Sequence, residues 1–403
     1  MNKRRKIAII KDTSKPMLGG HGLHVAFRGL PGVEIVAHAD SNTEHIDEKL
    51  GWSRARRHYS SWREMLENES PDIVTICSRH PGDHLPQIEA AARKGVHVYC
   101  EKPLAATLDE ADRIVEIAAK TGIKIGVAHP ARHAPRFRAM KKLLEAGEIG
   151  EPLTIHGRGK CDHRGGGEDL VVLGTHILDF MVFLFGRPEH VSAEITADGR
   201  PIAEGDRSET VEPIGPVAGD AVFARFAFPG GVRGVFESRK GLYAGGPPCM
   251  GVTVAGTKGA LSLRFDDARE RPLLISRLPA GPEYCANWEE TPVIEEREIP
   301  GAEPLDYSLC GKPDIPGAPM FLEAGRFAAW DLIRAIETNR PPIADVEDAR
   351  AVVEMIRAVY VSHLTGGIRI ALPLKSSLMS ETSGKAGGLE KVERLKAAQP
   401  YGH

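Results

Sequence analysis

The chain has 403 residues, of which 42% are hydrophobic and 27% are charged, and its formal net charge at pH 7 is −3. This length suits two domains, and the nearly balanced charge gives no indication of a nucleic-acid or membrane-surface partner. The basic first residues are followed by only a short apolar run, 7–10, so we expect no signal peptide and no spanning helix, and a cytoplasmic location. The six cysteines lack C-x-x-C spacing, which favours reduced, buried thiols.

The first third of the chain alternates apolar runs with helical patterns. Apolar runs of the buried-strand type lie at 7–10, 33–40, 73–77, 96–100 and 123–127. Helical patterns separate them, the first over 24–29 and the clearest over 108–121. Such alternation is typical of βαβ units and predicts a parallel, doubly wound Rossmann sheet in a first domain over residues 1–128.

The pattern changes from residue 151 onward. Stretches 221–228, 232–237 and 251–255 alternate apolar and polar residues, with a Pro-Gly-Gly turn after the first, and one helix is predicted before them over 168–185. The sequence then predicts an irregular Pro- and Gly-rich span, two helices, a closing strand and a polar, mobile tail, at 279–319, 321–339, 346–364, 368–374 and 375–403. The second domain, 129–374, is therefore expected to be α/β with a mostly antiparallel sheet.

Chemistry is most strongly indicated where the apolar run 96–100 ends at Glu101, Lys102 and Pro103. Ligands bind outside the carboxyl ends of strands in an open parallel sheet, so Lys102 is expected to point into a crevice. Pro103 restricts Lys102 to extended conformations, which would hold the ammonium group in one place. The alternative is a solvated lysine in a strand-to-helix turn.

The first strand-to-helix turn carries glycines, as a dinucleotide-binding fold requires, but in an unusual order. Residues 11–18 precede Gly19, Gly20, His21 and Gly22, which do not follow the G-x-G-x-x-G pattern. Backbone N–H groups in such a turn can bind a pyrophosphate, so we expect Gly20, His21 and Gly22 to contact a cofactor. A glycine-rich surface turn is the alternative.

Asp40 closes the second strand, about twenty residues after this turn. A carboxylate at this position accepts hydrogen bonds from the adenosine ribose and repels a 2′-phosphate, so we expect NAD as the cofactor. Arginines nearby at positions 54, 56 and 57 leave NADP open.

In their order and spacing, these motifs resemble the Gfo/Idh/MocA family of nicotinamide-dependent oxidoreductases, which act mainly on sugars, cyclitols and related polyols. The resemblance runs from about residue 6 to residue 374 and includes the motifs at 30–34, 101–103, 127–130, 145–150, 165–176 and 256–260. It implies NAD(P)-dependent hydride transfer at a secondary alcohol or ketone carbon, and homodimers or homotetramers paired through the second sheet. It also implies that Ser78, His80, Glu101 and Lys102 contact the cofactor, and that Lys102 is catalytic and touches substrate.

The resemblance places a second catalytic group on the helix predicted over 168–185. In the family pattern this helix carries an aspartate and, four residues later, a histidine; here the histidine is His176, but the aspartate position is Val172. Histidine suits proton transfer near neutral pH, so we expect His176 to be catalytic and to touch substrate. In one continuous helix Asp169 lies on nearly the same face, two turns before His176, and is a candidate substrate contact. The alternative for Asp169 is an acid favoured by the helix dipole.

Polar residues just after the domain junction, His129, Arg132 and His133, are predicted to contact a substrate with many hydroxyl groups. Cys161, Asp162 and the neighbouring His and acidic residues fit no metal-ligand spacing, so we predict no metal site.

Three functions stay open. In the first, an NAD(P)-dependent dehydrogenase, Lys102 polarises the substrate oxygen and passes its proton, and His176 is the acid or base. The second is a lyase, hydrolase or epimerase that keeps NAD bound and oxidises its substrate transiently; Val172 and the acids at 168 and 169 favour it slightly. The third is a binding protein that has lost catalysis, which the altered glycine loop suggests and the retained Lys102 and His176 oppose. Net NADH formation separates the first two.

Overall fold

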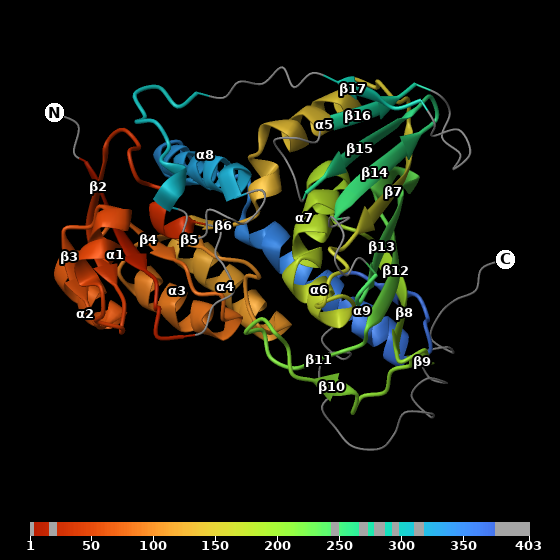
Figure 1. The fold of residues 1–403 in the computed structure, drawn as a ribbon, viewed down its shortest axis with the longest axis horizontal. Helices are drawn as coiled ribbons and strands as arrows, with labels where there is room; N and C mark the ends of the chain where they lie inside the picture. The colour runs from red at the N-terminus through yellow and green to blue at the C-terminus, as the bar shows by residue number, and fades with distance from the viewer. Residues whose placement is uncertain are drawn as a thin grey trace.

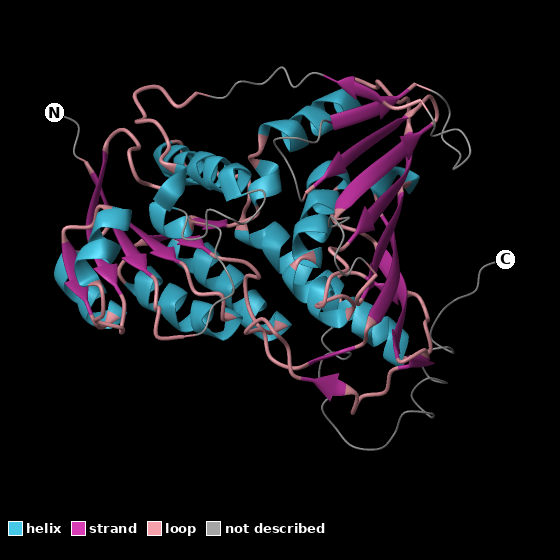
Figure 2. Ribbon diagram, in the orientation of Figure 1, coloured by secondary structure: helices cyan, strands magenta, loops and turns pink. Residues whose placement is uncertain are grey.

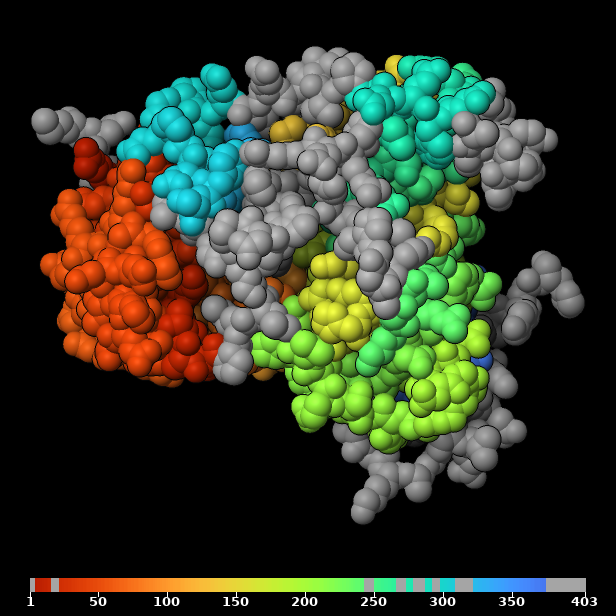
Figure 3. Space-filling model, viewed as in Figure 1, coloured from red at the N-terminus to blue at the C-terminus, as the bar shows by residue number. Residues whose placement is uncertain are grey.

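The computed structural model describes residues 4–15, 22–242, 250–265, 273–277, 287–291, 298–309 and 318–374. Two sheets with their helices form the left and right halves of the molecule in Figure 1. The two halves also form the two lobes of the face seen in Figure 3.

The first sheet is parallel, with strand order β3-β2-β1-β4-β5-β6. Its strands are β1 (Arg5–Ile10), β2 (Val33–Ala39), β3 (Arg57–Tyr59), β4 (Ile73–Ile76), β5 (His97–Cys100) and β6 (Ile125–Val127). Every residue of β4 is buried, as expected of a strand with helices on both faces. The predicted Rossmann sheet is confirmed. The short strand β3 was not predicted because its three residues are polar or aromatic.

The helices of this half are α1 (Ile46–Ser53), α2 (Trp62–Glu69), α3 (His84–Arg93) and α4 (Leu108–Thr121). Helix α4 has its predicted bounds because a capping box formed by Thr107 and Glu110 begins it, and Gly122, in the left-handed conformation, ends it. The helix predicted over 24–29 is wrong. Only a 3₁₀ turn, η1 (Leu23–Val25), forms there, since Gly29 has a positive φ and Pro31 disfavours a helical residue before it.

The second sheet has the order β17-β16-β15-β14-β7-β13-β12-β8-β18, with β9 paired to β8. Its strands are β7 (Pro152–Arg158), β8 (His190–Ala197), β9 (Arg200–Pro201), β12 (Ala221–Ala227), β13 (Arg233–Arg239), β14 (Gly251–Gly256), β15 (Ala260–Arg264), β16 (Leu273–Ser276), β17 (Glu289–Thr291) and β18 (Ile370–Ala371). A separate pair is formed by β10 (Arg207–Ser208) and β11 (Val217–Ala218). Among the described strands of this sheet only β7 and β13 pair in parallel, so the predicted mostly antiparallel sheet is confirmed. The predicted turn at 229–231 is the 3₁₀ turn η4 (Pro229–Gly231).

Helices cover one face of this sheet, and no described helix covers the other, here called the open face, as Figure 2 shows. They are α5 (Pro135–Glu145), α6 (Gly167–Val172), α7 (Gly174–Phe185) and α9 (Val346–Leu364). The single helix predicted over 168–185 is wrong, because the chain breaks at Leu173 into α6 and α7. A Cβ atom at Gly174 would lie 2.8 Å from the Phe236 ring, so this glycine allows α7 to pack directly on β13.

Helix α8 (Ala318–Glu337) lies within the range predicted for the second domain but packs on the first sheet. Its Ala329 and Leu332 share an apolar cluster with Ile7 and Ile9 of β1. The closing strand predicted over 368–374 is reduced to β18, and the predicted tail, 375–403, lies outside the described residues, as does much of the span 279–319.

Candidate active site

The carboxyl ends of β1, β2 and β4 meet at one edge of the first sheet, around a cavity of about 270 Å³. The cavity is lined by Ile10, Asp12, Lys15, Ala39, Asp40, Ser41, Ser60, Ser61, Trp62, Arg63, Ser78, Asp83 and Gln87. Of the predicted glycine-loop contacts, Gly20 and His21 lie outside the described residues. Gly22 begins η1 in the left-handed conformation, and a Cβ atom there would lie 2.6 Å from Leu322 of α8. The left-handed conformation and the nearby Leu322 therefore favour glycine at position 22.

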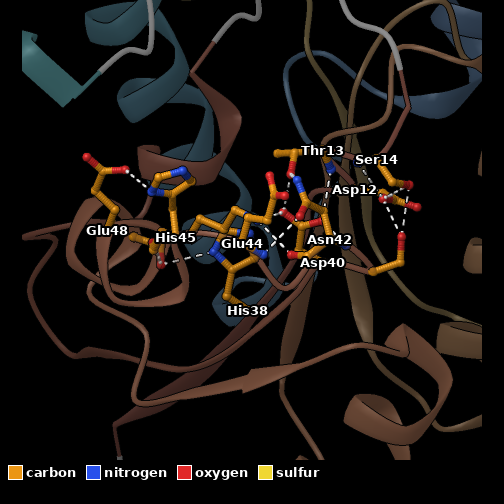
Figure 4. A network of polar contacts seen from close by, with 12 residues as sticks. Asp12, Thr13, Ser14, His38, Asp40, Asn42, Glu44, His45 and Glu48 are labelled. Atoms are coloured by element: carbon orange, nitrogen blue, oxygen red, sulfur yellow. Dashed lines mark hydrogen bonds and ion pairs between the residues drawn. The ribbon is translucent and has the colours of Figure 1, made fainter.

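Asp40 organises this edge, as Figure 4 shows. Its Oδ1 accepts hydrogen bonds from the N–H groups of Thr13 (2.9 Å) and Asn42 (3.0 Å). Its Oδ2 accepts one from the Thr13 hydroxyl (2.6 Å) and pairs with the Lys49 ammonium (2.9 Å). Burial raises the pKa of Asp40, but these donors outweigh it and hold the pKa below its usual value. Because all its acceptor positions are in use, a ribose hydroxyl would have to replace one of these donors, most simply the Thr13 hydroxyl.

Ser78 and His80 follow β4 at the same edge. The Ser78 hydroxyl donates to Asp83 (2.6 Å) and accepts from the N–H of His80 (3.2 Å). Asp83 also binds the Lys15 ammonium at 2.7 Å, which connects this turn to the end of the described β1 loop. Ser78 therefore lines the cavity and holds the turn that carries His80, and the cofactor contacts expected of both residues stay predictions.

Lys102 is buried directly after β5, beside the equally buried Glu101. Its Nζ donates to the backbone carbonyl of Val172, at the end of α6, over 2.6 Å. Burial first, and then the positive charge of Arg79, lowers the pKa of Lys102 to about 7, while the negative charge of Glu101 partly opposes the shift. Near neutral pH this amine can both donate and accept a proton, which a proton-transfer group requires. The predicted aspartate position thus contributes a carbonyl oxygen rather than a carboxylate.

His176 lies in the first turn of α7, four residues after Val172, and is buried. The His129 ring packs edge-to-face against it, with the ring centres 6.3 Å apart. His129 approaches the Thr175 hydroxyl through Nε2 (3.3 Å) and Asp179 through Nδ1 (3.1 Å). The two predicted histidines therefore lie side by side, at the start of the helix that follows Val172, the acceptor of Lys102.

Arg132 is buried and all its N–H groups face protein acceptors. Its guanidinium binds both carboxylate oxygens of Asp179 at 2.8 to 3.0 Å, the Ile343 carbonyl at 3.0 Å and Asp348 at 2.8 Å. Burial would raise the pKa of Asp179, but Arg132 and His129 hold it well below its usual range. These contacts give Arg132 a cross-linking role between η3 (Pro130–Arg132), α7 and the start of α9, and its contact with substrate stays a prediction.

Asp169 belongs to α6, so the reasoning that put it on the helical face of His176 fails with the break at Leu173. Its Oδ2 accepts hydrogen bonds from the Ser238 hydroxyl (2.5 Å) and the Cys161 N–H (3.1 Å). Burial raises the pKa of Asp169, and the Ser238 hydroxyl opposes the shift. The carboxyl group ties the start of α6 to β13.

Two arginines and an acid that the sequence did not single out surround Lys102. Glu212 binds Arg79, in the turn after β4, and Arg164, before α6. Arg79 stands between the two predicted cofactor contacts Ser78 and His80, and this position was the one feature of the sequence that could have marked it as functional. No feature of the sequence around Glu212 marks it, because its partners are distant along the chain.

Within the described ranges, no group of three His, Cys, Asp or Glu side chains is placed to hold a metal ion. None of the described helices is long and apolar enough to cross a membrane.

Two family models match the chain. Residues 20–129 match the model described as "Oxidoreductase family, NAD-binding Rossmann fold", and residues 137–262 match the "GFO/IDH/MocA C-terminal domain". Together they cover more than half of the chain. The chain belongs to the GFO/IDH/MocA oxidoreductase family. The resemblance in the motifs is thereby confirmed.

Relatives with a named activity match part of the chain. The chain is 32% identical over 191 residues to D-apiose dehydrogenase of Paraburkholderia graminis, an alignment that covers 45% of this chain and 51% of the relative. It is 26% identical over 242 residues to myo-inositol 2-dehydrogenase of Thermotoga maritima, covering 59% of this chain and 68% of the relative. The chain thus spans about half the length of the apiose enzyme.

Solved structures share the whole fold. Levoglucosan dehydrogenase in complex with NADH and levoglucosan superimposes with a TM-score of 0.68 at 21% identity, over 92% of this chain and all of the other. An oxidoreductase from Agrobacterium radiobacter, in complex with NAD+, L-tartaric acid and magnesium, gives 0.67 at 18% identity, over 91% and 98% of the two chains. At these identities the likeness shows the fold alone.

Proposed function

We propose that this protein is an NAD-dependent dehydrogenase that transfers hydride at a secondary alcohol or ketone carbon of a sugar, cyclitol or related polyol. The observation that carries the proposal is the buried Lys102 after β5, whose pKa of about 7 lets it exchange a proton near neutral pH. It stands at the carboxyl edge of the Rossmann sheet, where the family binds its nicotinamide cofactor, with His176 on the neighbouring helix.

The chain's own residues would divide the work as follows. The cavity beside Asp40 and Ser78 would hold the adenosine half of the cofactor, and the loop that includes Gly20, His21 and Gly22 would hold the pyrophosphate. Bound NAD supplies the hydride acceptor. Lys102 would bind the reacting oxygen and take its proton, and His176, oriented beside His129, would bind the same oxygen or a neighbouring hydroxyl.

The test begins with calorimetric titration of the cofactor-stripped protein with NAD and with NADP. NAD should bind in the micromolar range. Lys102→Met and His176→Asn should each bind NAD as the wild type does, and each should lose NADH formation in a screen of sugars and cyclitols. Failure to bind either nucleotide would refute the proposal and favour a binding protein that has lost catalysis.

The second candidate is a lyase, hydrolase or epimerase that keeps NAD bound. The backbone carbonyl of Val172, in place of a carboxylate beside Lys102, favours it. Product formation without net NADH accumulation would identify this class.

The open face of the second sheet supports a further part of the proposal, a homodimer or homotetramer. Phe223 of β12 is 44% exposed on this face, whereas its neighbours Val222 and Ala224 are buried. A second copy of this chain would cover Phe223. Light scattering of the wild type and of Phe223→Lys tests this assembly, and cell fractionation tests the proposed cytoplasmic location.

A further inference from the structure

A long excursion of the second sheet reaches the first domain. Residues 198–220, here called the junction arm, leave the sheet after β8, include β9, β10 and β11, and return into β12. Figure 1 shows the arm passing below α6 toward α4 of the first domain. The arm brings Glu212 into the junction between the two halves.

Glu212 joins three segments there. Its Oε2 lies 2.9 Å from Arg79 of the first domain, and its Oε1 lies 2.8 Å from Arg164 of the loop before α6. Its backbone N–H donates to Glu168 of α6 over 2.8 Å. Only 1% of the Glu212 side chain is exposed, so both ion pairs are shielded from solvent screening. A carboxylate in this position has a large effect on any charge beside it.

Lys102 lies at the same junction: it follows β5, which pairs with the strand β4 that precedes Arg79, and its Nζ contacts the end of α6, the helix whose Glu168 binds Glu212. The groups whose fields act on Lys102 are the cations Arg79 and Arg164 and the anions Glu101 and Glu212. The hydrogen-bond acceptor of its Nζ, the Val172 carbonyl, is neutral. Arg79 and Arg164 both disfavour a proton on Lys102, and both are paired with Glu212. Without Glu212, Arg79 would lose this counter-charge and, among the described residues, Arg164 would keep only Asp162, at 2.6 Å.

We propose that Glu212 is a positioning residue for Lys102: the junction arm inserts its carboxylate between Arg79 and Arg164, which keeps the Lys102 ammonium available as a proton donor. The inference rests on the proposed function in taking Lys102 as the proton-transfer group. In this proposal the carboxylate that acts on Lys102 comes from the junction arm. From the sequence, the candidates for a carboxylate at this site were the acids of α6, at 168 and 169.

The direction of the Lys102 pKa shift separates this role from a merely structural one. If Glu212 acts through its charge, Glu212→Gln lowers the pKa of Lys102, by about one unit for the loss of one nearby charge. If Glu212 only fastens the arm, its loss admits water to the junction, and the pKa of Lys102 rises toward 10.5, the usual lysine value. The two roles therefore predict opposite signs.

The experiment is an NMR titration of full-length protein carrying ¹³Cε-labelled lysine, with the Lys102 signal identified by its absence in Lys102→Met. Glu212→Gln is compared with the wild type and with Glu209→Gln, which removes an exposed acid of the same arm. We expect a downward shift of about one unit in Glu212→Gln and none in the control. An unchanged or raised Lys102 pKa in Glu212→Gln overturns the proposal.

A second comparison covers a failure of Glu212→Gln to fold. The double variant Glu212→Gln/Arg79→Gln removes both partners of one ion pair, and is compared with Arg79→Gln alone. The Lys102 pKa should be lower in the double variant, and equal values overturn the proposal. The titration uses neither cofactor nor substrate, so a wild type that fails to bind NAD by calorimetry refutes the proposed function without affecting this result.

Discussion

Replacing Lys102 by methionine should stabilise the protein at neutral pH, although it removes the proposed proton-transfer group. The pKa of this lysine is about 7 in the folded protein and 10.5 in its ordinary state. Between these values the unfolded chain binds more protons than the folded one, so the free energy of unfolding rises with pH across this window. Below pH 7 the lysine is protonated in both states, so the free energy of unfolding is reduced by the whole cost of burying the ammonium group.

The difference of pKa gives the magnitude. At pH 7 the linkage corresponds to about 4 kcal/mol of lost stability, and at pH 10 to about 1 kcal/mol. Methionine fills a similar volume without a charge, and it gives up the hydrogen bond to Val172, which is worth about 1 to 2 kcal/mol. Lys102→Met should therefore gain about 3 kcal/mol at pH 7 and nothing at pH 10.

Urea unfolding, followed by the fluorescence of Trp52, Trp62 and Trp330 around the first sheet, measures both values. Lys94→Met, which removes a partly exposed lysine paired with Glu67, is the matched control and should not change the pH dependence. A Lys102→Met variant no more stable than the wild type at pH 7, or a gain that is the same at both pH values, would show that this lysine is not depressed by burial.

Three further outcomes are expected. Asp40→Ala should weaken NAD binding about tenfold by calorimetry, because it removes the acceptor that holds Thr13 at the cavity; unchanged affinity would contradict this role. In the oxidation direction kcat/KM should rise with pH up to about 7 and then level, since only neutral Lys102 can accept the hydroxyl proton; a rate that falls across this range would exclude it as the base. Arg132→Met should cost about 3 to 5 kcal/mol in urea unfolding because it leaves Asp179 buried without its cation, and a loss no greater than that of an exposed arginine would contradict the cross-linking role.

The parts of this structure that depend on local sequence could be predicted. Hydrophobic runs gave the parallel strands, and capping residues gave the bounds of α4. The position of Lys102 followed from one rule about the ends of parallel strands. These features need only residues within one element or its flanks.

The features that local sequence did not show depend on contacts between distant segments. The break between α6 and α7 lies next to Gly174, which packs closely on Phe236 of β13. Helical periodicity cannot show this contact. Arg132 was predicted to contact substrate because it is polar and follows the domain junction. Its partners Asp179 and Asp348 lie 47 and 216 residues away along the chain, and their charges decide its role. No pattern around Arg132 contains that information.

The proposed proton transfer by Lys102 also depends on distant segments, because it needs the two halves of the molecule in contact. Lys102 comes from the first sheet, but the carbonyl of Val172 and the carboxylate of Glu212 that act on it belong to the second half of the molecule. Separation of the two halves would expose the Lys102 ammonium to water and return its pKa toward 10.5. Lys102 would then stay protonated at neutral pH and could not accept a proton. Under the proposed function, the contact between the two halves would keep Lys102 at a pKa at which it can act, and a molecule with separated halves would bind cofactor without reacting.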